Sequence, residues 1–239
     1  MTTIAHLSDV HLNGTLERRS RLAQALQRAS VADHLVLTGD LTEHGDPKHF
    51  VELGAVLGNW PGGAVTLVPG NHDSGNWGAQ LQGPLARFAR TSAFGAASDF
   101  GDVIIVPVDT RRPWRSLAFG ATGKVTDEQL QQLRSASQFG ESTGRCVVVA
   151  MHHGPQGSPL QWFDGLTNRE EINQILREYP GTFVVCGHDH RAMDLGQVFS
   201  AASCADVDDP LRLYSVIGRR LRPTYCGDRG HYMKGLGWT

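Results

Sequence analysis

Short runs of apolar residues, each about as long as a β-strand, recur along the chain. They are rich in Val and Leu and almost uninterrupted by polar side chains, a pattern typical of strands that are covered on both faces. The runs extend over residues 3–7, 34–37, 64–68, 103–108, 146–150 and 183–185. We therefore predict a strand in each of them.

Longer stretches between some of these runs have the spacing of amphipathic helices. In residues 16–29, Leu22 and Leu26 lie four positions apart, and Arg18, Arg21 and Arg28 occupy other positions of the segment. Residues 47–57 begin with a proline, which suits a first helical turn, and the segment from Thr126 resembles a capped helix start. Residues 167–179 are a fourth candidate. Strands that alternate with helices favour a layered α/β fold.

The length and composition fit a single domain. The chain has 239 residues, enough to bury a substantial core without disulfides. We find no internal repeat and no linker, so we expect one domain over residues 1–239. Residues 74–100 carry few strand signals, and there we expect irregular structure or a short helix.

Polar residues that can bind a metal ion directly follow most of the predicted strands. In chain order they are Asp9 and His11, Asp40, Asn71 with His72 and Asp73, His152 with His153, and His188 with His190. In open α/β sheets, ligands bind beyond the carboxyl ends of the strands. Asp9 and Asp40 lie 31 positions apart, and Asn71 follows after another 31, close to the roughly 30 residues of one strand–helix–strand unit. We therefore expect these residues to meet at one end of the sheet.

Glycine precedes the polar group at three of these strand ends, as Gly39, Gly70 and Gly187. A tight turn after a strand often needs a positive φ, and a bound ion needs a close approach of the backbone. A Cβ atom would obstruct either arrangement.

The residue types indicate which metals could bind. Carboxylate, imidazole and amide groups without a thiolate suit Mn, Fe, Zn or Co better than a soft metal. Seven ligands are too many for one tetrahedral ion, but they suit two divalent ions that share a carboxylate. Asp40, in the middle of the set, is the best candidate for the shared ligand. The predicted ligands are Asp9, His11, Asp40, Asn71, His152, His188 and His190.

The charge of such a cluster predicts its chemistry. Two divalent ions beside two carboxylates keep a net positive charge, which binds phosphate oxygens and stabilises the charge that develops during P–O cleavage. Metal binding can also lower the pKa of water from about 16 to about 7. The sequence therefore predicts phosphoester hydrolysis by a metal-bound hydroxide, without a Ser or Cys nucleophile.

These motifs resemble the calcineurin-like metallophosphoesterases, whose pattern is D-x-H, G-D, G-N-H-[DE], H and G-H-x-H in that order. Every element is present between Asp9 and His190. The resemblance implies a four-layer α/β/β/α sandwich. It also implies a first ion on Asp9, His11, Asp40 and His190, and a second ion on Asp40, Asn71, His152 and His188. His72 would be the acid near the leaving-group oxygen, and Asp73 would orient it.

The amino-acid sequence around the motifs is similar to that of one branch of the family, the bacterial class III cyclic-nucleotide phosphodiesterases. The segments 5–12, 37–42, 68–73 and 151–155 carry this similarity, although Gly154 stands where the branch usually has proline. The resemblance implies a small, cyclic-nucleotide-like phosphodiester as substrate, with Asn71 and His72 in contact with it. For His153, a core role and a substrate contact stay open equally.

The same residues allow several alternative functions. A phosphomonoesterase or a nuclease of the same family would use the same ligands, and a non-catalytic protein-binding scaffold would be expected to have lost some of them. The formal net charge of −2 argues against strong nucleic-acid binding. A homodimer is kept as an open alternative. The arginines at positions 212, 219, 220 and 222 are interpreted as a solvated surface.

Two further expectations concern the compartment. The four cysteines show no CxxC spacing, and Cys146 and Cys186 lie in apolar runs, which predicts buried thiols rather than a disulfide framework. No apolar run approaches the roughly 18 residues of a membrane span, and a predicted strand begins at once after the N-terminus, without a signal peptide. We therefore expect a cytoplasmic protein that does not bind membranes.

Overall fold

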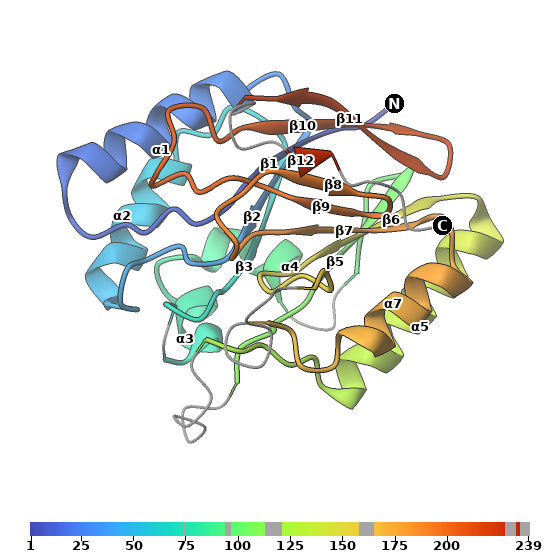
Figure 1. Cartoon of the computed structure of the whole chain (residues 1–239). Helices are drawn as coiled ribbons and strands as arrows, with labels where there is room; N and C mark the ends of the chain where they lie inside the picture. Colours follow the sequence, from blue (N-terminus) through green and yellow to red (C-terminus); the bar gives the residue numbers. More distant parts are fainter. Residues whose placement is uncertain (74, 94–96, 113–120, 158–164, 228–232, 235–239) are drawn as a thin grey trace.

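The computed structural model of the chain describes residues 1–73, 75–93, 97–112, 121–157, 165–227 and 233–234. Within these residues two β-sheets form the centre of the molecule (Figure 1). The first has the order β11-β10-β1-β2-β3 and the second the order β12-β8-β9-β7-β6-β5-β4. Parallel pairs join β1, β2 and β3 in the first sheet and β5, β6, β7 and β9 in the second.

The strands of the first sheet are β1 (Thr3–Leu7), β2 (His34–Thr38), β3 (Ala64–Val68), β10 (Arg212–Ile217) and β11 (Arg220–Cys226). Those of the second sheet are β4 (Ser98–Asp99), β5 (Val103–Pro107), β6 (Cys146–Ala150), β7 (Thr182–Cys186), β8 (Met193–Leu195), β9 (Val198–Ser200) and β12 (Met233–Lys234). Each of the six predicted runs is a strand, within one or two residues of its expected ends.

Helices cover the outer faces of the two sheets (Figure 1). Helices α1 (Leu16–Ala29) and α2 (Pro47–Leu57) pack on the first sheet, and α5 (Asp127–Thr143) and α7 (Arg169–Glu178) pack on the second. The order of layers is therefore helix, sheet, sheet, helix. This confirms the predicted four-layer α/β/β/α sandwich.

Alternate residues of the central strands serve two different cores. In β2, Leu35 and Leu37 pack with the helices of the first layer, whereas Val36 lies in the core between the sheets. In β6, Val147 and Val149 face helices α5 and α7, and Val148 faces the other sheet. Because both faces are buried, these strands read as unbroken apolar runs in the sequence.

The ends of the helices follow the local sequence signals. Asp46 caps α2 by accepting a hydrogen bond from the Lys48 N–H, and Pro47 occupies the first turn. Thr126 and Gln129 form a capping box at the start of α5. At the other end of α5, Gly144 has a φ of +71°, which favours glycine. The four predicted helices are confirmed.

The segment 74–100 contains the predicted short helix. Its described residues form α3 (Trp77–Gln82), a 3₁₀ turn η1 (Ala86–Phe88), α4 (Ala89–Ser92) and strand β4. Position 74 and positions 94–96 lie outside the described residues. The sequence signals did not predict β4, nor β8 to β12 near the C-terminus.

The surface interpretation of the four arginines is wrong for Arg212, whose side chain is buried between the sheets. Its Nη1 donates hydrogen bonds to the carbonyl oxygens of Met193 (2.9 Å) and Ser200 (2.6 Å), and its Nη2 pairs with Asp194. The guanidinium therefore joins β10 of the first sheet to β8 and β9 of the second. A buried charge is tolerated here because these acceptors replace water.

Two other expectations have clear outcomes. Cys146 and Cys186 are buried thiols without a disulfide, as the sequence predicts. No helix in the described ranges combines the length and the apolar character that crossing a membrane requires.

The buried histidine His34 generates a prediction about pH. Its Nε2 lies 2.9 Å from Thr66 Oγ1, and burial lowers its pKa from 6.5 to about 3. Below pH 6.5 this histidine therefore binds a proton in the unfolded chain but not in the folded chain. The free energy of unfolding falls as the pH drops below 6.5 for this reason. Between pH 7.5 and pH 5, we expect the free energy of unfolding of the wild type to fall by about 2 kcal/mol more than that of His34→Gln.

Urea unfolding at the two pH values, with chelator present throughout, measures this difference. His44→Gln changes an exposed histidine and should keep the wild-type pH dependence. An equal pH dependence of wild type and His34→Gln would contradict the prediction.

Candidate metal centre

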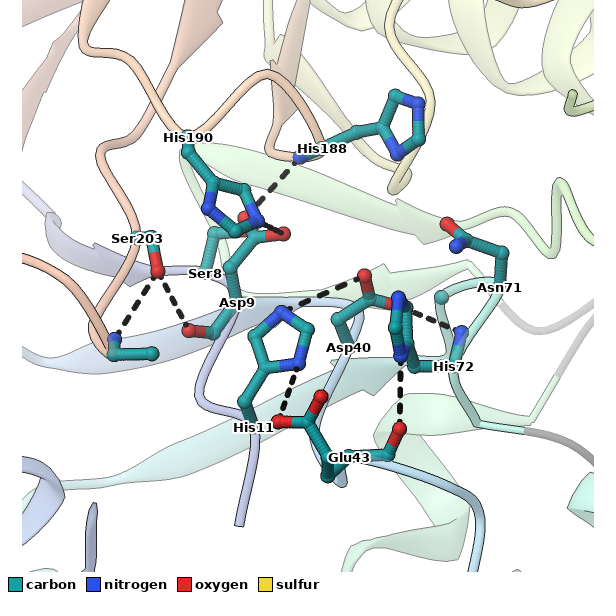
Figure 2. Close-up of polar contacts among 12 residues, drawn as sticks. Ser8, Asp9, His11, Asp40, Glu43, Asn71, His72, His188, His190 and Ser203 are labelled. Atoms are coloured by element: carbon teal, nitrogen blue, oxygen red, sulfur yellow. Dashed lines mark hydrogen bonds and ion pairs between the residues drawn. The ribbon is translucent and has the colours of Figure 1, made fainter. Parts of the chain in front are cut away.

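The predicted ligands come from both sheets and meet where the parallel strands end. Asp9 and His11 follow β1, Asp40 follows β2, Asn71 follows β3, His152 follows β6, and His188 and His190 follow β7. Figure 2 shows those from β1, β2, β3 and β7 gathered around Asp9 and Asp40. The expectation that distant segments converge at one end of the sheets is confirmed.

Close groups of nitrogen and oxygen atoms connect these residues into one cluster. In each group the atoms that could bind a metal all lie within 4.8 Å of one another. The groups that contain predicted ligands are Asp9 with His11 and His190, Asp9 with Asp40 and His152, His11 with Asp40 and His72, and His152 with His153 and His188. Asn71 joins the cluster through its Oδ1, which lies 3.0 Å from His152 Nε2.

Backbone conformation marks the same residues. Among the non-glycine residues that the structure describes, only five have a positive φ: Asp9 (52°), His11 (49°), Asp40 (46°), His188 (72°) and His190 (55°). All five are predicted ligands. Such conformations cost on the order of 1–3 kcal/mol each and persist where the surrounding structure enforces them, which is typical of functional sites.

The three glycines at the strand ends have the two roles that the sequence suggested. Gly39 has a φ of +87°, the conformation that favours glycine. At Gly70 a Cβ would lie 2.2 Å from Asp40 Oδ1, and at Gly187 it would lie 1.7 Å from Ser8 Oγ. The last two glycines therefore allow a neighbouring loop to approach the carboxylates closely.

Both carboxylates are held by one oxygen and face histidines with the other. Asp9 Oδ2 accepts a hydrogen bond from the His188 N–H (3.1 Å), and Asp40 Oδ1 accepts one from the His72 N–H (2.9 Å). The remaining oxygens, Asp9 Oδ1 and Asp40 Oδ2, each lie 3.3 Å from a histidine Nε2, that of His190 and that of His152. The arrangement leaves one oxygen of each carboxylate directed into the cluster.

Acceptors outside the cluster hold the far nitrogen of two histidines. His152 Nδ1 donates to the Thr38 carbonyl (2.8 Å), and His190 Nδ1 donates to Asp206 Oδ2 (2.6 Å). Because a carbonyl or carboxylate oxygen can only accept, the proton lies on Nδ1 and Nε2 is directed at the carboxylates. This is the tautomer that a metal ligand needs.

The electrostatics of the cluster follow from its two buried anions. Burial alone would lower the pKa of His152, but the charge of Asp40 and its hydrogen bond raise that pKa to about 10. At His190, the contact of the ring with Asp9 raises the pKa to about 9. Burial would raise the pKa of the Asp9 carboxyl, but His190 and His152 outweigh it and keep the group ionised. The site thus attracts positive charge.

The side chains fit a pair of divalent ions. Neither ring nitrogen of the buried His11 makes a hydrogen bond within the described residues, although Asp40 Oδ2 lies 3.8 Å from Nε2 and Glu43 Oε2 lies 3.3 Å from Nδ1. Polar atoms that are buried without partners are rare in folded proteins. Unpaired nitrogens among carboxylates, with further imidazole and amide donors close by, match the ligands that Mn, Fe and Zn prefer.

The orientation of His72 differs from the expectation. Its Nδ1 donates to the Glu43 carbonyl (2.8 Å), whereas the Asp73 carboxylate accepts hydrogen bonds from the backbone of Leu41, Thr42 and Gly70. Burial and the charge of Asp40 raise the pKa of Asp73 to about 6. Asp73 therefore joins the loop after β2 to the loop after β3, and a backbone carbonyl replaces it as the direct partner of the His72 ring.

For His153 the structure shows both ring nitrogens engaged. Nδ1 lies 2.7 Å from Thr110 Oγ1, and Nε2 lies 2.7 Å from the Ala121 carbonyl. The carbonyl requires the proton on Nε2, so Nδ1 accepts from the threonine. A substrate contact would have to break one of these bonds, which favours the core role of the two that the sequence left open.

Sequence reasoning missed the residues behind the ligands, which include Glu43 and Asp206. Glu43 lies only three positions after Asp40, and this nearness in the sequence could have indicated that Glu43 lies beside the cluster. Asp206 lies in an irregular loop between β9 and β10 that carries no motif. Only the folded backbone shows that this loop reaches His190.

Comparisons with known proteins agree with this geometry. A family model described as calcineurin-like phosphoesterase matches residues 2–192. A protein of Rhodococcus erythropolis named "probable cyclic nucleotide phosphodiesterase" is 26% identical over 204 residues, which is 78% of this chain and 64% of that protein. One of the same name from Synechococcus sp. is 29% identical over 211 residues, 80% of this chain and 75% of the relative. The chain thus spans less than two thirds of the Rhodococcus protein.

Among solved structures, a dimetal phosphatase from Danio rerio superposes with a TM-score of 0.75 at 14% identity, over 93% of this chain and 97% of that one. At this level of identity the likeness shows that the two chains share a fold.

The close approach at Gly187 generates a prediction. In Gly187→Ala the new Cβ would meet Ser8 Oγ at 1.7 Å and Asp9 Oδ2 at 2.5 Å, so Asp9 must move. We expect a loss of about 1–3 kcal/mol in stability and a smaller rise of the melting temperature on addition of Mn²⁺ than in the wild type. Thermal unfolding with chelator and with Mn²⁺ measures both effects.

Gly78→Ala is the matched control, because Gly78 is exposed in α3 and its Cβ would come no closer than 3.2 Å to Asn76 Oδ1. If Gly187→Ala unfolded like the wild type under both conditions, the close approach would have no role in holding Asp9.

Proposed function

This chain belongs to the calcineurin-like phosphoesterase family, and from that premise we propose that it hydrolyses a small phosphodiester with the help of two divalent metal ions. It is a phosphoric ester hydrolase by its family and by its relatives. The observation that carries the proposal is the cluster of Asp, Asn and His side chains, which includes every non-glycine residue of positive φ among those that the structure describes.

We assign the ligands as the family pattern implies. The first ion would be bound by Asp9, His11, Asp40 and His190, and the second by Asp40, Asn71, His152 and His188. The close group of Asp9, His11 and His190 supports the first set, and the closeness of His152 and His188 supports the second. So does the contact between Asn71 and His152. Asp40 lies between both sets, which suits a shared carboxylate.

When bound, two divalent ions supply positive charge for the phosphate oxygens and lower the pKa of water enough for a nucleophile to exist near neutral pH. The chain limits how much of that charge is cancelled, because only two carboxylates, Asp9 and Asp40, lie among the candidate ligands. The other five candidate ligands are imidazole and amide groups, which bring no negative charge. Net positive charge therefore remains for an anionic ester.

His72 is proposed as the acid that protonates the leaving group. The Glu43 carbonyl holds Nδ1–H, and one ring nitrogen of His72 lies within 4.8 Å of atoms of His11 and Asp40. With Nδ1 engaged, Nε2 is the nitrogen that can donate a proton at the metal side, and it does so from the imidazolium form. Asp73 supports this position indirectly by joining the two loops.

A small diester is favoured over longer substrates. The relatives from Rhodococcus and Synechococcus carry names for cyclic nucleotide phosphodiesterases, and we extend that substrate class to this chain as a proposal. The formal net charge of −2 gives no general attraction for a long nucleic acid. Asn71 and His72, which are partly exposed beside the cluster, are the proposed substrate contacts.

The first prediction from this proposal concerns metal and ester type. With Mn²⁺ added, we expect faster hydrolysis of bis(p-nitrophenyl) phosphate than of p-nitrophenyl phosphate, with loss of both on chelation and recovery when Mn²⁺ returns. Initial rates with both esters measure the ratio. Faster hydrolysis of the monoester would favour the phosphomonoesterase alternative. Activity that survives complete chelation would show that hydrolysis does not require a metal ion.

The second prediction concerns His72. An alkoxide leaves poorly without a proton, whereas p-nitrophenolate leaves easily, so the loss of a general acid affects the two differently. For His72→Ala we expect kcat/KM to fall by about 10²–10⁴-fold with 3′,5′-cyclic AMP and by much less with bis(p-nitrophenyl) phosphate. Equal losses on both substrates would show that His72 acts in binding or positioning and not as the acid.

A further inference from the structure

A carboxylate behind the cluster holds one of the candidate ligands in place. Asp206 Oδ2 lies 2.6 Å from His190 Nδ1, while His190 Nε2 lies 3.3 Å from Asp9 Oδ1. An ionised carboxylate can only accept, so it keeps a proton of His190 on Nδ1 and leaves Nε2 as the nitrogen that would offer its lone pair to a metal ion. The ring is thereby fixed in both tautomer and direction.

The position of Asp206 is built into the backbone of the same loop. The N–H groups of Cys204 and Ala205 donate to the carbonyl oxygens of Ser8 (2.9 Å) and Asp9 (3.1 Å). Ser203 Oγ donates to the Asp9 carbonyl (3.2 Å), as Figure 2 shows. The turn that carries Asp206 is therefore attached directly to the strained segment that carries Asp9.

This turn thus connects Asp9 and His190, two of the four residues that we assign to the first ion. Both have a left-handed backbone, with φ of 52° and 55°, a conformation that persists only where neighbouring contacts enforce it. At His152, on the second ion, the Thr38 carbonyl plays the part that Asp206 plays at His190. His152 is thus held by a main-chain carbonyl and His190 by a charged side chain.

We propose that Asp206 is a positioning residue that orients His190 and strengthens binding of the first metal ion. This inference rests on the proposed function, because it assigns His190 to a metal ion. Carboxylates that accept the second N–H of a ligating histidine also make the ring a better donor, and their removal typically weakens metal binding or activity by about 10–100-fold.

The test is a titration of the full chain with Mn²⁺, in which the free ion is followed by electron paramagnetic resonance. For Asp206→Ala we expect one of the two ions to bind about 10–100-fold more weakly and the other to bind with wild-type affinity. Asp206→Asn should lie between Asp206→Ala and the wild type, because its amide oxygen can still accept from Nδ1–H. Asp208→Asn is the matched control, since Asp208 lies two positions further along the loop with a fully exposed side chain.

The outcomes separate the inference from the proposed function. If the wild type bound two ions and Asp206→Ala bound both with unchanged affinity, the role of Asp206 would be refuted and the metal centre would stand. Equal weakening of both ions, together with a lower melting temperature in chelator, would show general support of the loop and refute selective positioning. A wild type that bound no Mn²⁺ would refute both.

Discussion

Two buried carboxylates, those of Asp9 and Asp40, are the groups on which the electrostatics of the site depend. They follow neighbouring parallel strands, are almost inaccessible to solvent and belong to one close group with His152. In the absence of a metal their charge raises the pKa values of His152 to about 10 and of His190 to about 9. A protein buries such charges at a cost unless cations balance them. We therefore regard these protons as occupying a place that divalent ions would fill.

The fold brings the carboxylates and their partners together through one geometric rule. Two sheets face each other, and the parallel strands at the middle of both end on the same side, so loops from distant parts of the chain meet there. The local conformation at that point is unfavourable, with left-handed φ angles at five candidate ligands and close backbone approaches at Gly70 and Gly187. One buried core lies on the outer face of each sheet and a third lies between the sheets. Together they supply the stability that offsets this strain.

Sequence patterns predicted the parts of the molecule in which local chemistry and tertiary structure agree. The apolar runs of β1 to β3 and β5 to β7 predicted strands because both faces of each are buried, and the Asp, Asn and His residues after them predicted the cluster. The short strands β8 and β9 and the exposed β11 lack such runs. Arg212 looked like a surface residue because its acceptors come from strands far away in the sequence. The same reason hid Asp206 and the Glu43 carbonyl, which bonds the His72 ring where the resemblance implied Asp73.

We propose that Asp40 is shared by two divalent ions bound by ligands from both sheets. Anomalous diffraction from crystals grown with Mn²⁺ tests it directly. We predict two peaks roughly 3.5–4 Å apart, both in contact with Asp40, one beside Asp9 and His190 and the other beside Asn71 and His152. A single peak, or peaks away from Asp40, would contradict the account.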